Sequence, residues 1–90
     1  MFIIEDEAHS EYIAEVQTWE EAITELKRLS KIPWDKEPNQ APCISWKTCG
    51  REYIIIEFDG DGNSAKQLRR VSALGVSAES ITWDPGFANL

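Results

Sequence analysis

The sequence holds little of the chemistry that most enzymes and metalloproteins need. It has one histidine, His9, and two cysteines, Cys43 and Cys49, in 90 residues. A triad or general base built on imidazole would depend on His9 alone, and neither a nucleophile motif nor a glycine-rich phosphate loop accompanies it. One imidazole and two thiols also cannot complete a tetrahedral zinc site. The sequence therefore predicts no enzyme, no cofactor and no metal centre, with His9 in a polar surface turn.

The two cysteines are expected to be free thiols. They lie six positions apart in a segment that we interpret as extended, which separates their Cα atoms by about 20 Å at ~3.3 Å per residue. A disulfide needs Cα atoms closer than ~7 Å, so only a sharp turn between Cys43 and Cys49 would permit one. Free thiols fit a reducing compartment.

Long hydrophobic runs are also missing. No apolar segment approaches the ~18 residues of a membrane-spanning helix, and the N-terminus lacks the basic segment of a signal peptide. With 42% hydrophobic residues, a chain of this length can fill one core but not two. We therefore expect a single cytoplasmic domain over residues 1–90 that does not bind membranes.

Basic residues are absent from the first part of the chain. Residues 1–26 hold eight acidic side chains and no Lys or Arg, whereas residues 27–90 hold nine basic and eight acidic ones. The formal net charge of −7 therefore arises in the N-terminal segment. Such a negative field repels nucleic acid and anionic membranes and attracts basic protein surfaces. An acidic surface that only keeps a small protein in solution is the alternative.

The clearest predicted element is a helix over residues 19–31. Thr18 and Glu21 have the spacing of a capping box, in which each side chain satisfies a backbone donor at the start of the helix. Apolar residues then recur three or four positions apart from Trp19 onward, and Pro33 ends the pattern. Trp19 is therefore expected to face the core.

Several short segments have the alternation or the β-branched composition of strands. They are residues 2–5, 11–16, 44–48, 52–59 and 80–83. Residues 52–59 are almost continuously apolar, which predicts a central strand buried on both faces. Residues 65–74 fit a second short helix, with a strand over residues 70–76 as its rival. The expected fold is α+β: a small antiparallel sheet of four to five strands packed on one main helix.

Two polar features of the predicted strands have an ordinary structural interpretation. Glu57 lies near the end of the central strand and is expected to pair with a neighbouring Lys or Arg. Asp59, Asp61 and Asn63 have the alternating spacing of the first half of an EF-hand calcium loop. Arg70 stands at the position where that loop needs a glutamate to bind calcium through both carboxylate oxygens. An ordinary turn is therefore predicted. A calcium-responsive loop ranks third among the possible functions.

The candidate residues for binding a partner are the acidic side chains of the N-terminal segment together with three aromatic residues. They are Glu5, Asp6, Glu7, Glu11, Glu15, Glu20, Glu21, Glu25, Tyr12, Trp34 and Trp83. The carboxylates would form one negative face if the predicted hairpin and the helix start lie together. Trp and Tyr supply large, rigid contact area at interfaces. Packing of the two tryptophans over the core is the alternative.

These features favour a protein-binding inhibitor that blocks a basic, nucleic-acid-binding site on a partner such as a nuclease, a toxin or a nucleoprotein complex. In acidity, length and expected fold class the chain resembles bacterial immunity proteins and phage-encoded anti-defence inhibitors, which implies competitive blockade. The alternative is a peptide-binding or self-associating regulatory domain that pairs strands at a sheet edge, including a homodimer. Electrostatic blockade should weaken steeply with salt, whereas edge pairing should not.

Overall fold

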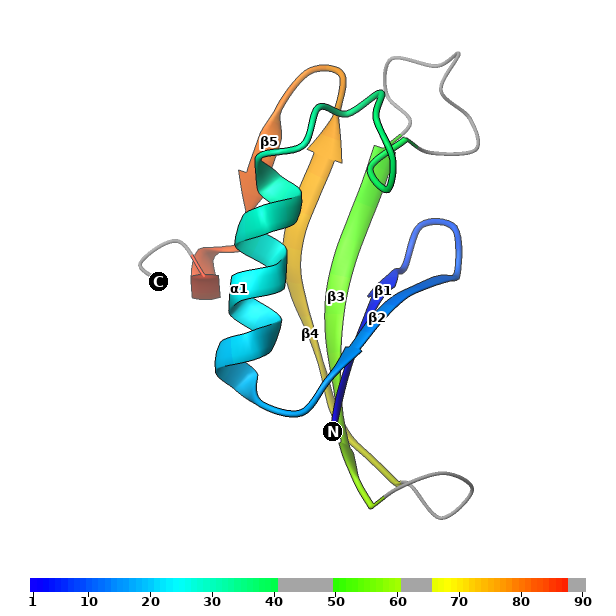
Figure 1. Ribbon diagram of the computed structural model, residues 1–90, viewed down its shortest axis with the longest axis vertical. Helices are drawn as coiled ribbons and strands as arrows, with labels where there is room; N and C mark the ends of the chain where they lie inside the picture. Colours follow the sequence, from blue (N-terminus) through cyan, green and yellow to red (C-terminus); the bar gives the residue numbers. More distant parts are fainter. Residues whose placement is uncertain (41–49, 61–65, 88–90) are drawn as a thin grey trace.

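The computed structural model describes residues 1–40, 50–60 and 66–87, which form a five-stranded antiparallel sheet with one α-helix (Figure 1). The elements in chain order are β1 (Phe2–Asp6), β2 (Glu11–Val16), α1 (Trp19–Ser30), β3 (Gly50–Asp59), β4 (Lys66–Ser77), β5 (Ile81–Trp83) and the 3-10 helix η2 (Pro85–Phe87). The strand order is β2-β1-β3-β4-β5. The predicted α+β class and the central position of β3 are confirmed.

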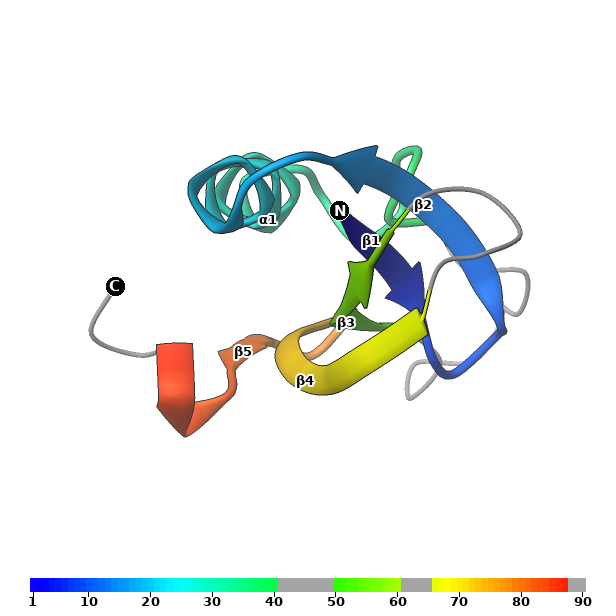
Figure 2. The same cartoon turned by 90° about the horizontal axis from the view of Figure 1, so that it is seen from below.

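The helix α1 begins where the capping box predicted. The Glu21 N–H donates to the Thr18 hydroxyl at 3.1 Å, and that hydroxyl lies 3.2 Å from the Glu21 carboxylate. Ala22, Leu26 and Leu29 are buried on the side of the helix that packs on the sheet. Figure 2 shows α1 on one side of a curved sheet.

Trp19 anchors the start of α1 in the core, as predicted. Its ring lies 5.8 Å from the Phe2 ring and 5.7 Å from the Phe87 ring, measured between centroids. The Arg69 guanidinium lies 4.7 Å from the centroid of the Trp19 ring and donates to the Glu57 carboxylate at 2.7 Å. The predicted pairing of Glu57 with a basic neighbour is therefore also confirmed.

Alternate residues of β3 point to the two faces of the sheet. Tyr53 and Ile55 belong to the core that packs against α1. Ile54 and Ile56 point to the opposite face and are each only 3% exposed. The central strand is thus buried on both faces, as its continuous apolar sequence predicted.

The strand β4 occupies the segment predicted as a second short helix over residues 65–74, so that prediction is wrong and its rival is right. The reason lies in two β-bulges, where Leu68 and Ala73 are extra residues opposite β3. The bulge at Ala73 leaves Val71 and Leu74 on the same face although they are three positions apart. Inward-facing residues of a bulged strand therefore reproduce the spacing of a helix.

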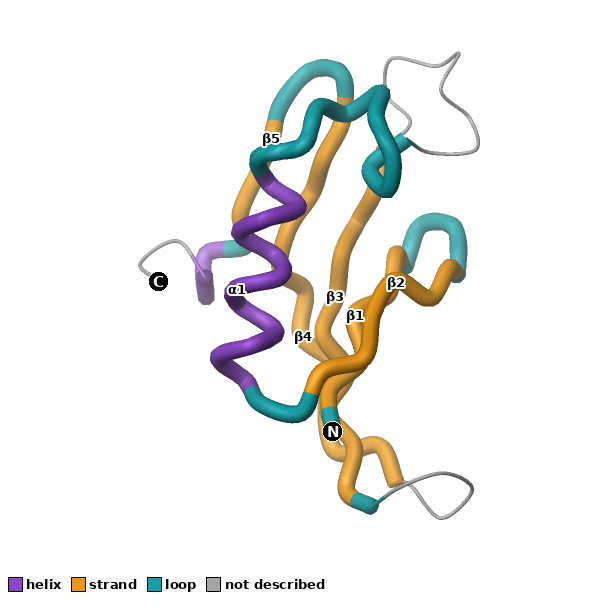
Figure 3. Tube along the Cα trace, in the orientation of Figure 1, coloured by secondary structure: helices purple, strands orange, loops and turns teal. Residues whose placement is uncertain are grey.

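The loop after α1 leads from the end of the helix toward the start of β3 (Figure 3). Asn39 in this loop is buried and fixes its path. Its side-chain amide donates to the Leu29 carbonyl at 2.7 Å and to the Ile32 carbonyl at 2.8 Å, and its carbonyl oxygen accepts from the Tyr53 hydroxyl at 2.6 Å. Burial raises the pKa of Tyr53 to about 12.

Three predictions fall outside the described residues. They concern the strand over residues 44–48, the thiols of Cys43 and Cys49, and the calcium-like positions Asp61 and Asn63. Within the part of the chain that the structure describes, no helix has the length and apolar character needed to cross a membrane.

Candidate functional site

A buried ion cluster joins the turn after β1 to the start of β3. Asp6 is wholly buried. Its carboxylate accepts from Arg51 at 2.8 Å and from the backbone N–H groups of Ala8 and Glu52 at 3.0 Å each, and His9 Nδ1 lies 2.6 Å away. Burial raises the pKa of Asp6, but the hydrogen bonds from Arg51, Glu52 and His9 outweigh it. The pKa therefore lies below its ordinary value. His9 itself is half-buried rather than fully exposed in this turn.

Arg51 is fully engaged in holding this cluster together. Its guanidinium donates to the carbonyl oxygens of Pro38 at 3.2 Å and Gln40 at 2.8 Å, and it lies 3.0 Å from the Glu11 carboxylate. Burial lowers the pKa of Arg51, whereas the hydrogen bond to Asp6 and the charges of Glu11 and Asp6 raise it. The raising effects together are larger, so the pKa of Arg51 lies above its ordinary value. The cluster therefore ties β1, the loop after α1 and β3 into one unit and offers little to an external ligand.

The predicted acidic residues do not form one continuous face. Asp6 is buried, which removes it from the surface. Three others are paired with arginine: Glu7 with Arg70 at 3.1 Å, Glu11 with Arg51 at 3.0 Å, and Glu25 with Arg28. The remaining four make no ion pair within the described residues: Glu5, Glu15, Glu20 and Glu21. Half of the expected carboxylates are thus neutralised or hidden by arginine partners.

The three candidate aromatic residues also differ in exposure. Tyr12 is 62% exposed on the edge strand β2. Trp34 and Trp83 are half-buried and pack against the hydrophobic core, which is the placement that the alternative interpretation describes. Tyr12 is therefore the candidate aromatic residue with most of its side chain available to a partner.

Tyr12 shares the face of the sheet opposite α1 with several charged residues. In the strand register, Tyr12 lies opposite Glu5, which in turn lies opposite Ile54, a residue that faces away from the core. Residues opposite each other in neighbouring strands point to the same face. By this register the face, called the distal face below, carries Glu5, Tyr12, Glu15, Glu52 and Arg70. The ion pair between Glu7 and Arg70 joins the turn after β1 to β4.

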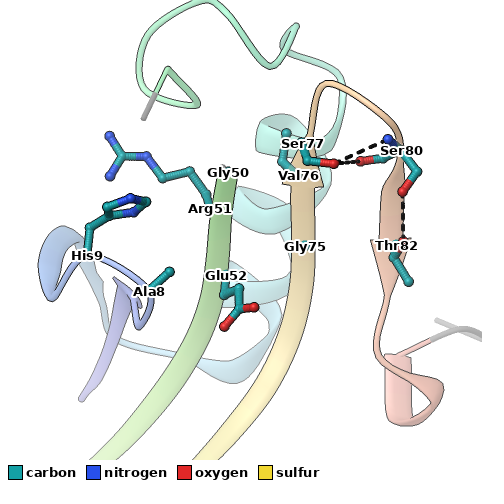
Figure 4. Close-up of a pocket in the computed structure, with 10 residues that line it drawn as sticks. All are labelled: Ala8, His9, Gly50, Arg51, Glu52, Gly75, Val76, Ser77, Ser80 and Thr82. Carbon is teal, nitrogen blue, oxygen red and sulfur yellow. Dashed lines mark hydrogen bonds between the residues drawn. The ribbon is translucent and has the colours of Figure 1, made fainter. Parts of the chain in front are cut away.

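A groove of about 330 Å³ lies at one end of the distal face. Its lining residues are Ala8, His9, Gly50, Arg51, Glu52, Gly75, Val76, Ser77, Ser80 and Thr82. Figure 4 shows Glu52 and Gly75 in the middle, between Ala8 and His9 on one side and Ser80 and Thr82 on the other. The hydroxyl oxygens of Ser80 and Thr82 lie 3.3 Å apart. The lining thus combines the Glu52 carboxylate, which only accepts hydrogen bonds, with hydroxyls that can donate or accept.

The residues of this groove were not predicted from the sequence. Gly75 was interpreted as the end of a short helix, although a glycine inside a strand often marks a bulge or a close approach of another group. Arg51 and Asp6 form their hydrogen bond across 45 positions in the chain, and no local pattern encodes such a pair.

The polar groups of this site can bind a ligand through hydrogen bonds and charge. Within the described residues no group of three or more His, Cys, Asp or Glu side chains is arranged to hold a metal ion. Every buried polar side-chain atom in the same part of the chain has a hydrogen-bond partner. The distal face, the groove and the first turn of α1 each present accessible polar groups. Comparison of the chain with models of protein families, with curated proteins and with solved structures gave no match.

Proposed function

We propose that this protein is a small acidic inhibitor that uses its distal face to cover a basic, nucleic-acid-binding site on a partner protein. One observation carries the proposal: Tyr12 is 62% exposed and lies beside Glu5 and Glu15, neither of which has an ion-pair partner within the described residues. An exposed tyrosine gives an interface a large rigid anchor with a polar tip. Carboxylates around it match lysine and arginine side chains that otherwise contact phosphate.

The charge of the protein supports the same proposal, because it attracts a basic partner before the two surfaces touch. The net charge of −7 favours rapid encounter with a basic surface and disfavours direct contact with nucleic acid. On the distal face, Glu5, Glu15 and Glu52 are unpaired among the described residues, and Arg70 is paired with Glu7. The free carboxylates of this face therefore exceed its free cationic groups.

A second candidate function is strand addition at the edge of the sheet. Among the described residues, β5 pairs only with Leu74, Gly75 and Val76, so β4 extends beyond it toward Lys66. Partners with an exposed strand can add to such an edge. However, Lys66, Arg69 and Arg70 lie in this stretch, and charged side chains on an edge strand oppose pairing with another chain. The distal face is therefore the better supported site.

The proposal is tested by capturing the partner with three forms of the protein. The wild type, the Glu15→Lys variant and the Asp35→Lys variant are compared at low and at high salt. Both substitutions change the net charge equally, but Asp35 lies in the loop after α1. We expect Glu15→Lys to lower the affinity at least about tenfold, equivalent to about 1.4 kcal/mol, and Asp35→Lys to change it much less.

The captured partner is then assayed for nucleic-acid binding. The proposal predicts that the wild-type protein displaces nucleic acid from this partner and that high salt releases the complex. Equal loss in both variants, binding that salt does not weaken, or a partner that still binds nucleic acid in the complex would each contradict it.

A further inference from the structure

We infer that the groove at the end of the distal face accepts the guanidinium group of an arginine side chain. The inference rests on the proposed function, because the arginine would belong to the basic partner. It assigns a chemical class of ligand to a recess that the exposed Tyr12 does not explain.

Gly75 leaves the floor of the groove open without being required by the fold. A Cβ atom built on Gly75 would meet only the Thr82 carbonyl oxygen, at an ordinary contact distance of 3.7 Å. At Gly50, by contrast, a Cβ atom would lie 2.0 Å from the Val76 carbonyl oxygen, so that position needs glycine. Glycine inside a strand lowers stability relative to a residue with a side chain. Its presence at position 75 keeps a flat stretch of peptide accessible.

Groups that can accept hydrogen bonds from a cation lie on both sides of this floor. The Glu52 side chain is exposed and forms no ion pair within the described residues. The Ser80 and Thr82 hydroxyls line the opposite wall. The one guanidinium in the lining, that of Arg51, is already bonded to Asp6 and lies 3.0 Å from Glu11. The other basic side chain in the lining, His9, lies 2.6 Å from the Asp6 carboxylate. Both basic side chains of the lining are thus engaged with Asp6, and an anion entering the groove would meet the unpaired carboxylate of Glu52.

The shape of the groove favours guanidinium over ammonium. A planar guanidinium can lie flat on the peptide floor at Gly75 while it donates two parallel hydrogen bonds to the Glu52 carboxylate. It then has further N–H groups for the hydroxyls of the opposite wall. A lysine ammonium is a compact, strongly hydrated charge that gains less from a flat surface. The volume of about 330 Å³ is at the lower end of ligand sites and suits one long side chain.

The test uses blocked amino acids, so it does not need the partner. Backbone amide NMR spectra of the full chain are recorded during titration with N-acetyl-arginine amide, with its neutral isostere N-acetyl-citrulline amide and with N-acetyl-lysine amide. We expect the arginine derivative to shift the amide signals of Glu52, Gly75 and Thr82 saturably. Equal shifts with citrulline, or shifts that avoid these three residues, would overturn the inference.

Two substitutions on β4 distinguish arginine binding in the groove from binding elsewhere on the surface. Gly75→Val fills the floor with a residue that strands favour, and Ser72→Val is its matched control because Ser72 is exposed on the same face of β4. We expect Gly75→Val to weaken arginine binding at least about tenfold and Ser72→Val to leave it unchanged. Glu52→Gln, which keeps the size of the side chain, should also weaken it. Unchanged binding in Gly75→Val or in Glu52→Gln would overturn the inference.

The same variants distinguish this inference from the proposed function. If the partner is captured equally by the wild type and by Gly75→Val but is lost with Glu15→Lys, the inference is wrong and the proposed function stands. If N-acetyl-arginine amide binds in the groove but no basic partner depends on Glu15, the groove is supported and the proposed function is wrong.

Discussion

The two faces of the sheet use the same types of residue for different purposes. On the helix-covered face, Tyr53 is 1% exposed and its hydroxyl donates to Asn39, while the Asp6 carboxylate is wholly buried against Arg51. On the distal face, Tyr12 is 62% exposed and Glu15 is exposed without an ion pair among the described residues. Residue type alone therefore does not reveal whether a tyrosine or a carboxylate holds the fold or remains available for binding.

The difference has an energetic basis. A buried charge destabilises the folded state unless its partner and its hydrogen bonds are in place, whereas an exposed charge contributes little to stability. Substitutions on the helix-covered face should therefore lower the free energy of unfolding, and those on the distal face should change binding.

The largest loss is expected from Asp6→Asn, which removes the buried counter-charge of Arg51 and leaves it only the partly exposed Glu11 carboxylate. We expect the free energy of unfolding to fall by about 3–5 kcal/mol, measured by urea denaturation at neutral pH. The matched control is Glu25→Gln, which breaks the exposed pair with Arg28 and should cost less than about 1 kcal/mol. An equal loss of unfolding free energy in the two variants would contradict the claim that the buried Asp6–Arg51 pair matters more to stability than the exposed Glu25–Arg28 pair.

The Asp6 pair should also make stability depend on acidity. Because the folded-state pKa of Asp6 is lowered, the folded state binds its proton less readily than the unfolded state. Its contribution is complete above the unfolded pKa of about 3.9 and is lost as the pH falls through the lower folded pKa. The stability difference between wild type and Asp6→Asn should therefore narrow in acid. A difference that is constant with pH would contradict this.

Truncating an apolar side chain should also lower the free energy of unfolding much more on the helix-covered face than on the distal face. Ile55 is wholly buried toward α1, so Ile55→Ala should cost about 2–5 kcal/mol. Tyr12→Ala on the distal face should cost less than about 1 kcal/mol. Thermal and urea melts of both variants measure the contrast. A destabilising effect of Tyr12→Ala as large as that of Ile55→Ala would place Tyr12 in the core rather than on a binding face.

The buried Tyr53 should make the stability of the fold fall in alkali. Burial raises the pKa of Tyr53 to about 12, so its contribution is complete below the unfolded pKa of about 10 and is lost as the pH rises toward about 12. The corresponding change is about 2–3 kcal/mol. Tyr53→Phe should flatten this part of the stability profile, measured by urea denaturation at a series of alkaline pH values. A profile that Tyr53→Phe leaves unchanged would contradict the assignment.

The smallest expected effect concerns the cap of α1. Thr18→Ala removes the acceptor for the Glu21 N–H and should cost about 1 kcal/mol. Thr18→Ser, which keeps the hydroxyl, should cost less. Urea melts with a common slope measure both values. A Thr18→Ala variant as stable as the wild type would show that the cap does not fix the start of α1.

The fold was predictable where local chemistry determines structure. Thr18, Glu21 and the spacing after Trp19 identified α1, and the continuous apolar run identified the central strand. A helix over residues 65–74 was preferred to the strand over residues 70–76 because the bulges of β4 at Leu68 and Ala73 shift the alternation of inward-facing residues. A bulge forms against the partner strand, so its position cannot be read from one strand alone.

The site was less predictable because pairing partners lie far apart in the chain. The acidic character of residues 1–26 was evident, but nothing local indicated that Arg70 would pair with Glu7 across 63 positions. The burial of Asp6 likewise depends on Arg51, which lies on another strand. Composition thus predicted the sign of the charge, and the register of the sheet decided which carboxylates remain available.

The most direct test of the distal face as a binding surface is amide cross-saturation NMR of the labelled protein in complex with its captured partner. The account predicts that saturation transfers to the amides of Tyr12 and Glu15 on β2 and of Glu52 on β3. It also predicts little transfer to Thr24 and Lys27 on the outer surface of α1, both of which are exposed. Transfer confined to α1, with none on the distal face, would contradict the central claim.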